Sequence, residues 1–89
     1  MDDYPNWTTR EVDLIVMNTH DIYFAQLEIH KALVDAKDVW SREAVEDFLS
    51  RHLSEYLKEV FENQEEYEEI DFDFLANAWN AEMKEEWGA

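Results

Sequence analysis

The stretch "SREAVEDFLSRHLSEYLKEVFEN", residues 41–63, sets the class of fold that we expect for this chain. Ser41 is a favourable helix N-cap, and apolar residues follow it every three or four positions, which is the spacing of one face of an α-helix. That face consists of Ala44, Val45, Phe48, Leu49, His52, Leu53, Tyr56, Leu57, Val60 and Phe61. The opposite face is mainly acidic. The pattern therefore predicts one amphipathic helix over 41–63, with an apolar face about five turns long.

The segment before this stretch predicts two further helices. Thr8 and Glu11 have the spacing of a capping box, so a helix is expected over 9–18. The β-branched residues within 12–17 keep a strand as the alternative for that segment. Apolar residues at three- and four-residue spacing then predict a second, amphipathic helix over 20–36.

The segment after it predicts one more helix. Asp71 is a good N-cap, and Ile70 before it can pack against Leu75, so the last helix is expected over 72–87. The intervening "NQEEYEE", residues 63–69, is the candidate for a long loop. The sequence as a whole therefore predicts an all-α fold, a compact bundle of about four helices.

Composition supports a single acidic helical domain over residues 1–89. The chain is 46% hydrophobic and includes four Trp, which is enough apolar mass to build a core. One Gly and one Pro leave little material for the tight turns of hairpins and barrels. With no cysteine, no secretory signal and no apolar run of about 20 residues, we expect a cytoplasmic protein without a membrane span.

The charge of the chain points to the kind of partner. Its formal net charge is −16, which repels nucleic acid and anionic membranes and attracts basic surfaces. Residues 41–89 hold 15 acids and four bases, whereas residues 1–40 hold eight acids and three bases. The acidic field is therefore concentrated in the second half of the chain.

Carboxylates at helical spacing supply a candidate binding surface. On one helix, acids three or four positions apart lie about 5 to 6 Å from each other, which is close to the spacing of successive phosphates along a DNA strand. Glu55, Glu59 and Glu62, followed by Glu66, can form such a row. The full set of expected partner-binding residues is Glu55, Glu59, Glu62, Glu65, Glu66, Tyr67, Glu68, Glu69, Asp71, Asp73 and Trp87.

Metal and catalytic sites find little support in the sequence. His20, His30 and His52 lack the spacing of zinc ligands, and His30 and His52 fall on apolar stripes, where core packing is the simpler interpretation. Carboxylate pairs such as Glu65-Glu66 arise by chance in a chain with 23 acids. We expect no catalytic residue, no metal and no cofactor. The four Trp are expected to fill the core or its edge, with Trp87 the best candidate for a partner contact.

Three segments resemble a known family. They are "NWTTREV" at 6–12, the segment 18–23, and "IDFDFLANAW" at 70–79. Together they are similar to a family of small acidic proteins from phages, plasmids and other mobile elements, which begin with Trp-Thr-Asn-Arg-Glu and end with an Asp-aromatic segment leading into Ala-x-x-Trp. This chain has Thr9 where Asn is usual. That family has no agreed activity, so the resemblance implies no catalytic residue.

What the resemblance implies is a context of conflict with a bacterial host. Mobile elements commonly encode compact acidic proteins that block restriction enzymes or CRISPR effector complexes, often where DNA would bind. The sequence thus predicts a non-enzymatic, DNA-mimicking inhibitor that binds a basic groove in the host cytoplasm, with an anti-CRISPR or antirestriction role. The alternative is a small adaptor or regulator, possibly a homodimer through the helix 41–63, in which acidity serves only solubility.

Overall fold

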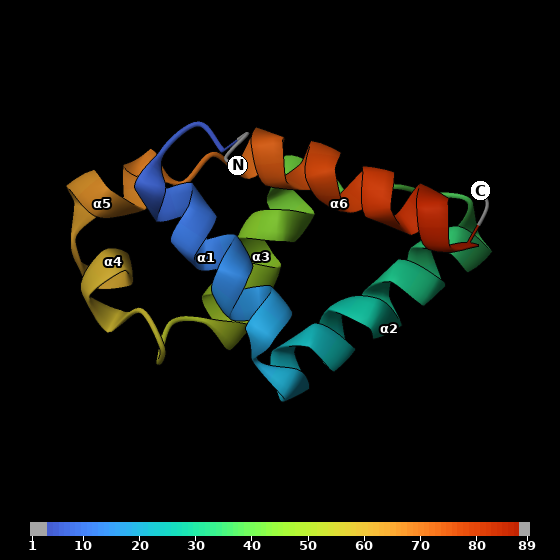
Figure 1. The fold of residues 1–89 in the computed structure, drawn as a ribbon, viewed down its shortest axis with the longest axis horizontal. Coiled ribbons are helices and arrows are strands. Elements are labelled where there is room, and N and C mark those ends of the chain that lie inside the picture. Colours follow the sequence, from blue (N-terminus) through green and yellow to red (C-terminus); the bar gives the residue numbers. More distant parts are fainter. Residues whose placement is uncertain (1–3, 88–89) are drawn as a thin grey trace.

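The computed structural model describes residues 4–87, except for the side chains of Glu59, Glu86 and Trp87, and within these limits the chain is all-α (Figure 1). The prediction of the fold class is confirmed. The predicted number of four helices is not, because the described residues form four longer helices and two short ones. The helices are α1 (Trp7–Asn18), α2 (His20–Ala36), α3 (Arg42–His52), α4 (Lys58–Glu62), α5 (Gln64–Glu69) and α6 (Phe72–Trp87).

The capping of α1 differs from the predicted capping box. The helix begins at Trp7, and the cap is Asn6, whose Oδ1 accepts a hydrogen bond from the Thr9 backbone N–H at 2.8 Å. Residues 12–17 lie inside α1, so the strand alternative is wrong. The boundaries of α2 agree with the predicted 20–36.

The predicted helix 41–63 is broken into α3 and α4. Ser41 caps α3 as expected, through a hydrogen bond from the Ala44 N–H, but α3 ends at His52 and turns follow over 53–57. A straight helix over 41–63 would be about 34 Å long, almost the 36 Å of the molecule's longest dimension. Its last turns would leave the core. The break lets Leu57, Val60 and Phe61 pack back against that core instead.

The predicted loop 63–69 is also wrong, because it contains α5. Asn63 makes this helix possible: its Oδ1 accepts hydrogen bonds from the backbone N–H groups of Glu65 and Glu66. The start of α6 is as predicted, since Asp71 Oδ1 accepts a hydrogen bond from the Phe74 N–H at 2.9 Å. Ile70 and Leu75 are both buried in the core.

The core surrounds Trp79, as predicted for this residue. Its ring makes edge contacts with the rings of Trp40 and Phe48, at centroid distances of 4.8 and 5.7 Å. The other buried apolar residues of the cluster are Val12, Val16, Ile22, Val45, Leu49, Leu53, Ile70, Phe72, Leu75 and Ala76. Trp7 does not join them: it is 69% exposed, and the Arg10 guanidinium lies over its ring. The prediction that Trp7 fills the core or its edge is therefore wrong.

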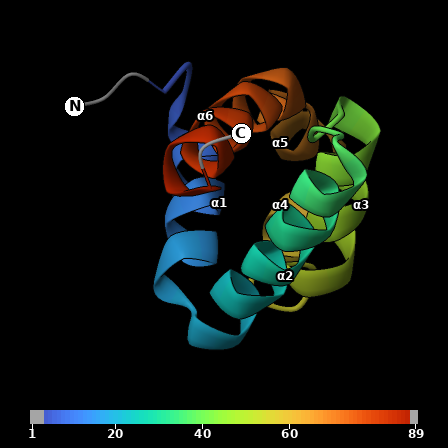
Figure 2. The same cartoon turned by 90° about the vertical axis from the view of Figure 1, so that its right-hand side faces the viewer.

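The arrangement of the helices gives the molecule two distinct ends. In Figure 1, α4 and α5 lie at one end of the long axis, and the C-terminal ends of α2 and α6 lie at the other. Figure 2 shows α1 on one side, α2 and α3 on the other, and α6 across the top. α6 packs against α3 and α2 on one side, and a hydrogen bond from Trp79 of α6 to Asp13 links it to α1 on the other side.

The break after α3 predicts different costs for two residues of the same apolar stripe. Leu53 is fully buried, whereas Tyr56, three positions on, is 58% exposed. Leu53→Ala should lower the free energy of unfolding by about 2 to 5 kcal/mol, and Tyr56→Ala should change it by less than about 0.5 kcal/mol. Urea denaturation measures both. Similar losses for the two variants would support the unbroken helix and contradict the structure.

The buried imidazole of His30 predicts a dependence of stability on pH. His30 is 2% exposed on α2, and burial lowers its pKa from the ordinary value of 6.5. Because the unfolded chain binds the proton more readily, this contribution to stability is present above pH 6.5 and is lost as pH falls through the lower pKa of the folded state.

The matched variant for this test is His30→Phe, which keeps an aromatic ring against Trp40. Between pH 7.5 and 5.5, the wild-type protein should lose stability relative to His30→Phe in urea denaturation at each pH. Parallel pH profiles for the two proteins would show that His30 is not responsible.

Candidate acidic binding surface

The strongest concentration of charge lies on the turn after α3 and on α4 and α5. Residues 53–73 hold nine acids and one base, Lys58. The acids of this stretch whose side chains are exposed are what we call the acidic surface; most belong to α4 and α5, which occupy one end of the molecule (Figure 1), and Asp73 belongs to the start of α6. They are Glu55, Glu62, Glu65, Glu66, Glu68, Glu69 and Asp73.

The aromatic residue inside this surface faces the protein rather than the solvent. Tyr67 is half-buried, and its hydroxyl donates a hydrogen bond to Glu46 Oε2 on α3 at 2.6 Å. Its ring packs against Phe61 and Phe72, at centroid distances of 5.4 and 5.7 Å. Burial, together with the hydrogen bond to Glu46, raises the pKa of Tyr67. Tyr67 therefore holds α5 against the core, and its contact with a partner stays a prediction.

Threonines at the start of α1 fix the C-terminal end of α5. The Thr9 hydroxyl donates to the Glu69 carbonyl at 3.2 Å and accepts from the Asp71 N–H at 3.0 Å. Asn6 Nδ2 donates to the same carbonyl at 2.6 Å, and the Thr8 hydroxyl donates to Glu69 Oε1 at 2.8 Å. This group, the Thr9 junction, was hidden in the sequence because its partners are about 60 positions apart.

The other predicted binding residues divide into three groups. Asp71 is half-buried and serves as the cap of α6, so its carboxylate is already engaged. The side chains of Glu59 and Trp87 lie outside the described part of the structure. The acidic surface is thus formed by the predicted glutamates whose side chains are described, together with Asp73.

The predicted row of carboxylates on one helix is wrong. Glu55 lies in the turn after α3, Glu62 ends α4, and Glu66 lies in α5. The regular spacing expected along a single helix axis therefore does not extend over these residues. Instead, a turn and two short helices that pack together present the charges.

Sequence reasoning also missed a buried carboxylate in α1. Asp13 is 6% exposed; its Oδ1 accepts a hydrogen bond from Trp79 Nε1 at 2.9 Å, and its Oδ2 accepts one from the Tyr4 hydroxyl at 2.6 Å. Burial, and then the neighbouring Asp13, raises the pKa of Tyr4 to about 12. The available signal was a single acid within the apolar run "VDLIV". Both oxygens are engaged in tertiary contacts, so Asp13 has a structural role.

Clusters of metal-binding side chains and membrane-spanning helices are both absent from the described residues. Residues 4–87, as far as their side chains are described, contain no group of three or more His, Asp or Glu placed to hold a metal ion. Within the same limits, no helix combines the length and apolar character that crossing a bilayer requires.

Comparisons with known proteins add no assignment. Neither a protein-family model, nor a curated protein, nor a solved structure matches the chain. The resemblance of 6–12 and 70–79 to proteins of mobile elements therefore stays a prediction.

The Thr9 junction predicts unequal effects of two neighbouring valine substitutions. Thr9→Val leaves the part-buried Asp71 N–H without its acceptor and should cost about 1 to 3 kcal/mol. Thr8→Val removes only the exposed bond to the Glu69 side chain and should cost less than about 0.5 kcal/mol. Urea denaturation of the two variants gives both values. If Thr8→Val costs as much as Thr9→Val, the junction does not work as described.

Proposed function

We propose that this protein is a non-enzymatic inhibitor that places its acidic surface in the basic groove of a nucleic-acid-binding protein. The observation that carries the proposal is that the apolar and the acidic side chains of residues 61–74 differ in their exposure to solvent. The branched and aromatic side chains of that stretch are buried or half-buried, whereas its glutamates and Asp73 are exposed. The solvent-facing side of this segment therefore consists mainly of acidic side chains, while its apolar side chains face the protein.

The electrostatics favour a charge-driven association. Seven exposed carboxylates lie among residues 55–73, where Lys58 is the one base. Such a field accelerates encounter with a positively charged groove and also selects against acidic partners. Because the charges are exposed, salt screens their attraction, with a Debye length that falls from roughly 14 Å at 0.05 M to about 4 Å at 0.5 M. The complex should accordingly weaken steeply over this range.

The class of partner follows from the similarity of a dense array of carboxylates to the phosphates of a nucleic acid. Grooves that bind the phosphates of DNA or RNA are lined with Lys and Arg. A protein with this surface would compete with nucleic acid for such a groove and would not bind nucleic acid itself. Together with the resemblance to mobile-element proteins, this favours a bacterial defence protein as the target, either a CRISPR effector or a restriction enzyme, in the host cytoplasm.

The alternative of a homodimer through the helix 41–63 loses its proposed interface. Val45, Phe48 and Leu49 of α3 are buried in the protein's own core. The stripe that the sequence offered for dimerisation therefore already packs within the monomer. An adaptor whose acidity serves only solubility differs from our proposal in one measurable respect, since its complexes should be insensitive to competing DNA.

The proposal predicts that partner binding depends on where the exposed acids lie on the molecule, and not only on how many there are. Two triple variants remove the same number of exposed acids from different ends of the molecule. The surface variant replaces Glu62, Glu66 and Glu68 with Gln; the control variant carries Glu28→Gln, Asp35→Asn and Glu85→Gln. Each immobilised protein is exposed to a nuclease-treated bacterial lysate at low salt. Bound proteins are then eluted with rising salt or with duplex DNA.

The expected result is a partner that duplex DNA displaces, that the control variant retains, and that the surface variant binds at least about tenfold more weakly, because three favourable charge contacts are lost. Equal retention by both triple variants would remove the acidic surface from the interface. A partner that is indifferent to DNA would support the adaptor alternative.

A further inference from the structure

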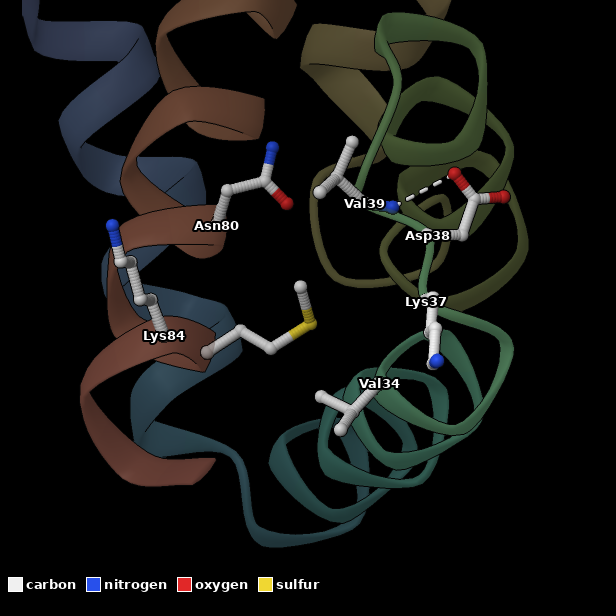
Figure 3. A pocket seen from close by; sticks show the side chains of 7 residues that line it. Val34, Lys37, Asp38, Val39, Asn80 and Lys84 are labelled. Atoms are coloured by element: carbon white, nitrogen blue, oxygen red, sulfur yellow. Dashed lines mark hydrogen bonds between the residues drawn. The ribbon is translucent and has the colours of Figure 1, made fainter. Parts of the chain in front are cut away.

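A pocket of ≈ 610 Å³ lies at the end of the molecule opposite the acidic surface. It is formed where the C-terminal end of α2 and the linker to α3 pass the last turns of α6. Figure 3 shows Val34 and Val39 on one wall and Asn80 and Lys84 on the other. The complete lining is Val34, Lys37, Asp38, Val39, Asn80, Met83 and Lys84.

The walls of this pocket are mainly apolar, and hydrogen bonds between Asn80 and the Trp40 backbone fix their relative position. Val34, Val39 and Met83 supply apolar surface, and Val39 is 57% exposed. Asn80 clamps the linker to α6: its Oδ1 accepts from the Trp40 N–H at 2.7 Å, and its Nδ2 donates to the Trp40 carbonyl at 3.1 Å. Both walls therefore belong to fixed elements.

The charge of the lining is opposite to that of the rest of the protein. Lys37 and Lys84 contribute two positive charges and Asp38 one negative charge, in a chain with a net charge of −16. Asp38 Oδ1 already accepts a hydrogen bond from the Val39 N–H at 2.8 Å. Within the described residues neither lysine forms an ion pair. The two lysines lie on opposite walls, and the Lys84 ammonium points away from the pocket (Figure 3), so Lys37 is the cation considered for an anion here.

The backbone at Lys37 gives an independent reason to assign a role to its side chain. Lys37 has φ 57° and ψ 42°, the left-handed conformation, and among the described residues it is the one non-glycine with a positive φ. Its N–H and that of Asp38 bond to the last carbonyls of α2 in the pattern of a Schellman cap. Glycine is the usual residue there because it has no Cβ penalty. A lysine at this position has a less favourable backbone conformation than a glycine would have, but it places a positive charge beside the pocket.

We propose that this pocket binds a small organic anion with an apolar body, of the class of medium-chain fatty acids. The volume and the mainly apolar lining fall within the range of small-molecule sites. The alkyl chain would lie against Val34, Val39 and Met83, and the carboxylate would accept a charge-assisted hydrogen bond from Lys37. The site is separate from the acidic surface and does not depend on the function proposed for it.

Decanoate is the probe for the test, at concentrations below micelle formation and at 0.15 M salt, where the Debye length of about 8 Å screens repulsion from the acidic surface. Amide NMR shifts should change and saturate for Val34, Val39, Asn80 and Lys84, and should stay unchanged in α5. Decyltrimethylammonium, with the same alkyl chain and the opposite charge, should bind at least about fivefold more weakly.

Two lysine variants separate the role of the side chain from that of the backbone. Lys37→Gly should leave the melting temperature unchanged or higher, because glycine suits the left-handed conformation, yet it should weaken decanoate binding about fivefold. Lys31→Ala, on the exposed side of α2, is the control and should change neither value. Equal affinity for the two amphiphiles, shifts outside the pocket, or normal binding by Lys37→Gly would overturn the proposal. So would a concentration-dependent dimer in which these amides shift without any ligand.

Discussion

The buried hydrogen bond between Trp79 and Asp13 is the contact on which the rest of the structure depends. It joins α6 to α1, 66 positions apart, and places the Trp79 ring where Trp40 and Phe48 pack against it. A buried carboxylate is tolerated only when its oxygens are satisfied, and the indole N–H and the Tyr4 hydroxyl do this. Once α1 and α6 are joined, the helices between them must fold within the space that remains.

Both candidate sites follow from how the intervening chain fills that space. The stretch 41–63 forms two helices in place of one, and the segment beyond the break folds into α4 and α5 with the aromatic side chains inward and the glutamates outward. At the opposite end, α2 terminates at a left-handed Lys37, and the linker returns along α6, which leaves the apolar pocket. One end is therefore strongly acidic, and the other presents two lysines beside apolar walls.

The sequence predicted those features whose signals are local. The cap at Asp71, the cap at Ser41 and the limits of α2 depend on neighbouring residues and were confirmed. The end of α3 at His52 was not predicted, because the apolar spacing continues through 53–61 and the return of Leu57, Val60 and Phe61 to the core is a tertiary feature. The acidic surface was predicted from charge, but its shape was wrong. The lysine pocket was missed because residues 34–39 and 80–84 meet only in the folded chain.

The central claim is that the exposed carboxylates of α4 and α5 contact the nucleic-acid groove of a partner. Zero-length carbodiimide cross-linking tests it most directly, because it couples a carboxylate to a lysine only when the two are in contact. In a complex with a DNA-displaceable partner, we expect cross-links from Glu62, Glu65, Glu66 or Glu68 to lysines that line the partner's groove. Cross-links confined to Glu28, Asp35 or Glu85, or to lysines outside the groove, would contradict the account.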